Sequence, residues 1–135
     1  MEGQMISGLN KNTLEILDSI LFVFHNLIIF VNLFGWMIPF LRKTQRLLIS
    51  LTAFSWFVIG FFYGFGYCIV TDMHYQVLYA LGKTDLPNSY IKYLLDKIFG
   101  TDLNALYVDI GTGAGFAVAV IGAVWVWRRE KSLQK

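Results

Sequence analysis

Three long apolar blocks alternate with short polar segments along this chain. The blocks cover residues about 14–41, 47–70 and 103–127, and they contain few charged side chains. A helix needs roughly 20 apolar residues to cross the hydrocarbon core of a bilayer, which is about 30 Å thick. Each block is long enough, so the pattern predicts three transmembrane helices.

A segment of different character, 72–101, separates the second block from the third. Apolar residues recur there every three or four positions in two short stretches, as they do on one face of a helix. Asn88 or Ser89 is suited to cap the start of the second stretch, and Gly100 is suited to end it. We therefore expect two short amphipathic helices that lie at the membrane interface or fold over the bundle.

The apolar fraction of the chain supports the same architecture. Of the 135 residues, 56% are hydrophobic, which exceeds the roughly 45–50% that is usual for soluble domains. A soluble domain of this size would leave large apolar patches exposed to water. The sequence therefore predicts an all-α integral membrane protein, a single domain over residues 1–135, with the lipid bilayer as its environment.

Basic residues are divided unevenly between the two ends of the predicted helices. The N-terminus and the segment 72–101 hold only four of them. The loop after the first block and the C-terminal tail hold Arg42, Lys43, Arg46, Arg128, Arg129, Lys131 and Lys135. Because cytoplasmic loops carry the excess of Lys and Arg, we expect the N-terminus outside and the C-terminus in the cytoplasm. The formal net charge of +2 is too small to indicate nucleic-acid binding.

Three polar side chains interrupt the first block at intervals of seven residues: Asp18, His25 and Asn32. Seven residues are nearly two helical turns, so the three lie on one stripe that drifts by about 20° per step. An acid that faces hydrocarbon costs about 2.5–3.5 kcal/mol near the middle of a helix. The stripe is therefore expected to face protein, water or a ligand.

The other predicted helices carry polar residues that could meet this stripe. We expect one pocket in the outer half of the bundle, with Asp18, His25 and Asp109 turned toward one another. The further members of this candidate pocket are Asn32, Thr112, Tyr67, Cys68, Thr71, Asp72 and His74. Ionisable residues inside a membrane are candidates for a functional site, whereas amides and hydroxyls commonly join helices by hydrogen bonds.

Two pairs of glycines are spaced four residues apart, Gly60 with Gly64 and Gly111 with Gly115. Small residues at this spacing let spanning helices approach closely. We expect these glycines to pack the helices of one chain, and a homodimer formed through them is the alternative.

Specific chemistry is not indicated by any motif. No spacing of His, Cys, Asp and Glu matches a zinc site, so no metal is predicted and the cofactor stays unassigned. The only cysteine, Cys68, lies near His74 in the sequence but has no other activator, so no catalytic residue is assigned.

Three functions remain open from the residues alone. The leading hypothesis is a non-enzymatic accessory or structural protein, with a membrane protein or a second copy of the chain as its partner. One alternative is a membrane-embedded enzyme or carrier that acts on a lipid-like or quinone-like molecule through Asp18, His25 and Asp109. Another is a b-type haem protein that uses His25 from both chains of a homodimer.

An ordered set of features runs through most of the chain. They are Asp18 and His25, then Gly35-Trp36, CIVT at 68–71 and PNSYIKYL at 87–94. In this order they resemble the small bacterial membrane proteins grouped as domain of unknown function twenty-seven eighty-four. The chain differs from that pattern at Ile69 and His74, where relatives commonly carry proline and glutamate. The resemblance implies the same architecture in a bacterial inner membrane, and it implies no particular reaction.

Overall fold

The computed structural model describes residues 8–135, and the part of the predicted domain before Gly8 lies outside the described residues. All regular structure within this range is helical, which confirms the predicted all-α class. Three helical stretches are long and apolar enough to cross a membrane: α2 (Lys11–Phe34), the run Pro39–Tyr63, and α7 (Ala105–Leu133). The prediction of three helices with the length and composition of transmembrane spans is therefore confirmed.

The second stretch lies closer to the N-terminus than the predicted 47–70. It begins at Pro39, whose fixed φ and missing N–H are tolerated in the first turn of a helix. It ends before Gly64 (φ +116°) and Gly66 (φ +85°), because these backbone conformations cannot continue a helix and favour glycine. The stretch consists of η1 (Pro39–Leu41), α3 (Arg42–Phe54), the π-helical turn η2 (Ser55–Ile59) and α4 (Gly60–Tyr63).

Two shorter helices, α5 (Ile69–Ala80) and α6 (Tyr90–Phe99), connect the second stretch to α7. The Ser89 side chain caps α6 by accepting a hydrogen bond from the Lys92 N–H at 3.4 Å. Gly100 ends the helix with φ of +65°, a left-handed conformation that glycine adopts without strain. Both ends of α6 therefore lie where the sequence predicts them.

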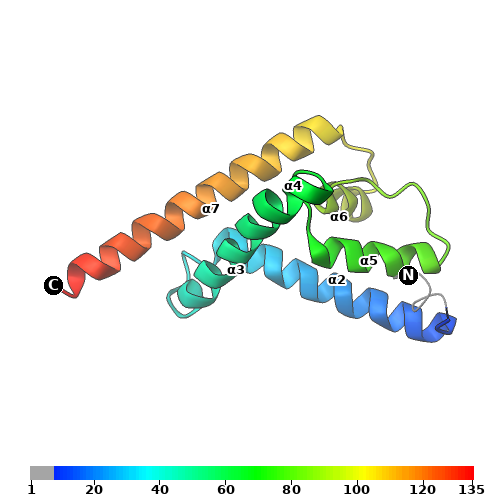
Figure 1. The fold of residues 1–135 in the computed structure, drawn as a ribbon, viewed down its shortest axis with the longest axis horizontal. Helices are drawn as coiled ribbons and strands as arrows, with labels where there is room; N and C mark the ends of the chain where they lie inside the picture. The colour runs from blue at the N-terminus through cyan, green and yellow to red at the C-terminus, as the bar shows by residue number, and fades with distance from the viewer. Residues whose placement is uncertain (1–7) are drawn as a thin grey trace.

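The other helices are arranged around α2 (Figure 1). α5 packs along its N-terminal half, whereas α3 and α7 contact it nearer its C-terminal end. A small buried core lies where α5 and α6 meet, at Tyr75, Leu78 and Tyr90, and Ile29 of α2 packs against it. Many large apolar side chains elsewhere are exposed, as expected for helices that are surrounded by lipid.

The closest helix contacts involve two glycines outside the predicted pairs. A Cβ atom on Gly122 of α7 would lie 2.6 Å from the Trp36 ring, and one on Gly35 would lie 2.7 Å from Gln45 of α3. Neither contact is compatible with a larger residue unless the neighbouring side chain moves. These two positions therefore set how closely α3 and α7 approach the C-terminal end of α2.

The predicted pairs of packing glycines are placed differently. A Cβ on Gly115 would meet Leu33 of α2 at an ordinary 3.5 Å, whereas one on Gly64 or Gly111 would meet nothing within 4 Å. Gly60 is buried against the following turn of its own chain, where a Cβ would lie 3.4 Å from the Gly66 nitrogen. Gly64 serves instead to end the second stretch, as described above.

Hydrogen bonds connect α2 to α3 beside these glycine contacts. Asn32 Nδ2 donates to Thr52 Oγ1 at 2.9 Å, and Gln45 Nε2 donates to the Asn32 carbonyl at 3.1 Å. The Gln45 side chain is completely buried. These bonds satisfy polar groups that would otherwise face an apolar environment, so they favour one fixed pairing of α2 with α3.

We expect Gly122→Ala to lower the free energy of unfolding by about 1–3 kcal/mol, because the added methyl group overlaps the Trp36 ring. Gly113→Ala in the same helix is the matched control, since a Cβ there meets nothing within 4 Å. The control should be neutral or stabilising by up to about 1 kcal/mol, because alanine favours helix more than glycine. Denaturant unfolding in detergent micelles measures both, and equal stability of the two variants would contradict the close packing at Gly122.

Candidate functional site

A hydrogen bond between α2 and α5 forms the centre of the candidate site. Asp18 Oδ1 lies 2.6 Å from His74 Nε2, and the His74 side chain is completely buried while that of Asp18 is 25% exposed. His74 shares a buried face of α5 with Val77 and Leu78, one helical turn further on. Burial of this face against α2 therefore carries the imidazole to the carboxylate.

The Asp18 carboxylate fixes the orientation of the His74 ring. A carboxylate accepts hydrogen bonds, so Nε2 donates the proton in this contact, and a neutral imidazole then presents Nδ1 as an acceptor. Nδ1 is buried and has no hydrogen-bond partner within residues 8–135. The arrangement thus leaves one polar atom of a fully buried side chain available to a water molecule or ligand.

His25 forms a second contact, nearly two helical turns further along α2 than Asp18. Its Nε2 lies 3.8 Å from the sulfur of Cys68, which belongs to the non-helical segment between α4 and α5. The Tyr90 ring from the start of α6 covers the imidazole, with ring centroids 3.9 Å apart. His25 is therefore enclosed by three parts of the chain, and only 5% of it is exposed.

Tyr90 joins the two histidine contacts into one unit. Its ring centroid lies 5.7 Å from that of His74, in addition to its contact with His25. Burial, together with nearby Tyr93, raises the pKa of the Tyr90 phenol, which therefore stays protonated at physiological pH. We name Asp18, His25, Cys68, His74 and Tyr90 the polar cluster.

Aromatic side chains surround this polar cluster. Tyr75 and Tyr93 pack against Tyr90, with ring centroids 6.4 and 5.5 Å from it. Burial also raises the pKa of the Tyr75 phenol, with nearby Tyr93 adding to the effect. The polar groups are thus enclosed in an aromatic shell contributed mainly by α5 and α6.

Most of the predicted pocket residues lie near one another, but they form more than one group. Cys68 and His74 belong to the polar cluster, and Thr71 is half-buried between them on α5. Tyr67 donates a hydrogen bond to Asp72 at 3.2 Å. Asn32 instead bonds to Thr52 of α3, away from the cluster.

Asp109 and Thr112 of α7 are not brought to the polar cluster. The Asp109 side chain is exposed, and within residues 8–135 no hydrogen bond or ion pair joins it to Asp18 or His25. Thr112 donates to the Val108 carbonyl of its own helix at 2.8 Å. The physical reason is that α7 and α2 diverge toward this end of the molecule (Figure 1), with α5 and α6 between them. The expected trio therefore reduces to Asp18 and His25, with His74 in place of Asp109.

Tyr90 is a site residue that no sequence pattern indicated. Its signal was indirect: Ser89 caps a short helix, and Tyr90 is the first residue after that cap. A capped helix start has a defined direction, so the aromatic ring there is held in a fixed position. Spacing alone could not reveal that this ring would be inserted beside the two histidines.

The residues present do not fit a haem or a multi-ligand metal site. His25 Nε2 faces Cys68 and its Nδ1 is buried, so an axial contact to haem iron would require the side chains around the imidazole to be displaced. Nor do any three His, Cys, Asp or Glu side chains between Gly8 and the C-terminus converge closely enough to hold a metal ion. The donor set is better suited to proton sharing and hydrogen bonding.

Comparisons with known proteins identify a family and assign it no chemistry. A family model described as "Protein of Unknown function (DUF2784)" matches residues 15–129, a range that contains the whole polar cluster. No curated protein and no solved structure matches the chain.

We expect Asp18→Ala to lower the free energy of unfolding by about 1–3 kcal/mol, because it leaves the buried His74 without its hydrogen-bond partner. Asp109→Ala removes an exposed acid and should change the stability by less than about 0.5 kcal/mol. Unfolding of both variants in the same detergent gives the comparison. If Asp109→Ala proves as damaging as Asp18→Ala, the assignment of Asp18 to a stabilising buried contact is wrong.

Proposed function

The chain belongs to the DUF2784 family of proteins of unknown function, and from that premise we propose that it is a small accessory protein of a bacterial inner membrane. In this proposal α5 and α6, which we name the outer cap, are fastened to α2 by the polar cluster. The cap then presents a fixed surface on the outer side of the membrane to a membrane protein partner. No reaction is assigned to the chain.

The single observation that carries the proposal is the Asp18–His74 contact, 2.6 Å long with the imidazole completely buried. A charge-assisted hydrogen bond in such a place is worth about 1.5–3 kcal/mol, and breaking it leaves an unsatisfied group inside the protein. His25 and Tyr90 add a stacked contact between α2 and α6. The Asp18–His74 and His25–Tyr90 contacts of the polar cluster thus join the cap to a spanning helix, as a structural clamp requires.

The proposed orientation rests on the distribution of charge. Arg42 and Arg46 at the start of α3 lie beside Glu130 near the end of α7, at the opposite end of the bundle from the outer cap. This end also carries the basic tail of α7. An excess of cations at one end favours its location in the cytoplasm, which places the N-terminus and the cap outside.

A second candidate function is favoured by two buried nitrogen atoms. Nδ1 of His25 and Nδ1 of His74 both lack a hydrogen-bond partner within the described part of the chain. Buried polar atoms are usually satisfied, so such a pair favours a bound molecule that has polar atoms of its own. A lipid-like or quinone-like ligand that enters when α6 moves aside would meet this requirement.

Purification from bacterial membranes in mild detergent separates the two functions. For an accessory protein we expect a protein partner in fixed proportion to the chain. We also expect the Asp18→Ala variant to lose this partner. Residues 69–80 of the same variant should lose their protection from amide hydrogen exchange. Asp109→Ala is the matched control and should retain both the partner and the protection, because Asp109 is exposed and outside the cluster.

The ligand function predicts a different result from the same preparations. Mass spectrometry would then find about one lipid or quinone molecule for each chain, and His25→Ala would lose it while the outer cap stays protected from exchange. That outcome, without a protein partner, would overturn the accessory proposal.

A further inference from the structure

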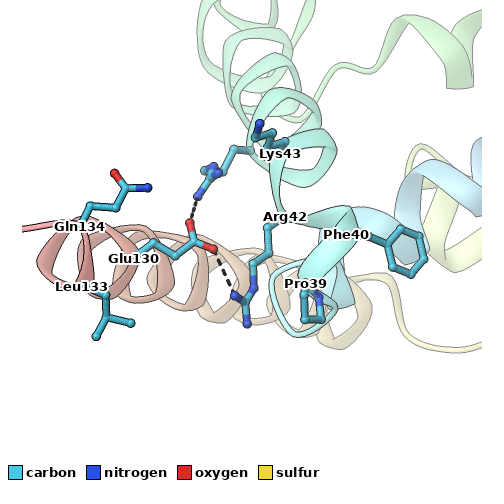
Figure 2. A pocket seen from close by; sticks show the side chains of 8 residues that line it. Pro39, Phe40, Arg42, Lys43, Glu130, Leu133 and Gln134 are labelled. Carbon is cyan, nitrogen blue, oxygen red and sulfur yellow. Dashed lines mark hydrogen bonds and ion pairs between the residues drawn. The ribbon is translucent and has the colours of Figure 1, made fainter.

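A second polar site lies at the end of the bundle opposite the outer cap. A cavity of about 570 Å³ opens there between the start of the second stretch and the end of α7 (Figure 2). Its lining includes Arg42, Lys43, Arg46 and Glu130, together with the apolar side chains of Phe40 and Leu133. We name this cavity the basic pocket.

The charges of the basic pocket are unbalanced. Glu130 lies between two guanidinium groups, with Oε1 3.1 Å from Arg42 and Oε2 2.9 Å from Arg46. Lys43 is exposed beside them. Three cationic side chains and one carboxylate therefore line the pocket, which keeps an excess of positive charge.

The two guanidinium groups are held in place but retain free donors. Arg42 also donates from Nε to the Trp36 carbonyl at 3.2 Å, which ties it to the end of α2. Each guanidinium carries five N–H donors in a rigid fork, and Arg46 uses one of its nitrogens on Glu130. Both side chains are only about 30% exposed. Their positions are thus set before any ligand arrives, which lowers the cost of binding an anion.

The rim of the basic pocket is apolar. Phe40 is 82% exposed and Leu133 is 81% exposed, both at the same end of the spanning helices as the arginines. Trp125 and Trp127, also exposed, lie on the same helix as Leu133, six to eight residues before it, and tryptophan gathers where lipid meets water. A soluble anion has no apolar part that could contact this rim, whereas a phospholipid places its phosphate directly beside glycerol and acyl chains.

We propose that the basic pocket binds the phosphate headgroup of an anionic phospholipid. Arg42, Arg46 and Lys43 contact the phosphate and any further negative charge of the headgroup, while Phe40 and Leu133 contact the start of the acyl chains. Basic pockets between spanning helices are suited to such headgroups, and arginine matches the geometry of phosphate oxygens. The site is independent of the polar cluster and of the accessory function proposed above.

Lipid titration of the full chain tests this assignment. The purified protein in detergent is titrated with phosphatidylglycerol or with phosphatidylcholine, and bound lipid is counted by native mass spectrometry. We expect phosphatidylglycerol to bind at least about tenfold more tightly. The double variant R42Q/R46Q should lose at least about tenfold of that affinity, since each cation near an anionic headgroup contributes about fivefold.

Two further variants control for misfolding and for non-specific electrostatic attraction. Lys43→Gln changes an exposed side chain, so it should keep the fold and lose about fivefold in phosphatidylglycerol affinity. R128Q/R129Q removes two exposed cations close by on α7 that do not line the pocket, and it should lose less than about threefold.

Several outcomes would overturn the lipid assignment. Equal binding of the two lipids would do so, as would equal losses in K43Q, R42Q/R46Q and R128Q/R129Q, which would indicate a diffuse charge effect. Inorganic phosphate is the remaining arm of the experiment. If millimolar phosphate binds to the pocket and displaces phosphatidylglycerol completely, the site is one for soluble phosphate.

Discussion

The arrangement of this molecule depends on the contact between the Asp18 carboxylate and the His74 imidazole, which lies beside an apolar environment. Asp18 lies in α2, the first of the long apolar helices, and His74 lies in α5. Their contact requires α5 to run back along α2 with one face inward. Once α5 is in that position, the core around Tyr75 and Leu78 forms, and α6 can place Tyr90 over His25. The half of the structure that contains α5 and α6 therefore depends on one buried polar contact.

Hydrophobic periodicity predicted the all-α architecture and the three long apolar helices. It also predicted that Asp18, His25 and Asn32 would avoid lipid, and each contacts another element of the structure. Those contacts are made with three different partners, because a stripe of about 20 Å in length cannot meet one site. The polar side chains were recognisable from the sequence, and Cys68 and His74 were expected in the same pocket, whereas the individual pairings and the Thr52 contact were not.

The features that could not be predicted depend on the tilt of the helices relative to one another and on the positions at which helices end. Asp109 lies at a depth on α7 similar to that expected for Asp18, but the two helices diverge and α5 fills the space between them. Gly64 and Gly66 end the second stretch early, so the break at Cys68 lies beside the middle of α2. The spacing of residues along the sequence does not show how helices cross, nor which glycine ends a helix. It also did not distinguish Gly122, which packs against Trp36, from glycines that pack against nothing.

The two ends of the bundle have opposite chemistry. At one end, ionisable side chains are paired and enclosed, so they hold the outer cap in place. At the other end, the two arginines remain partly exposed, and their positive charge exceeds the negative charge of Glu130. A double-mutant cycle with Asp18→Ala and His74→Ala, measured by unfolding in detergent, tests the first of these claims most directly. We predict a coupling energy of at least about 1 kcal/mol, because the two side chains stabilise the fold through each other. Strictly additive losses would mean that the pair does not fasten α5 to α2.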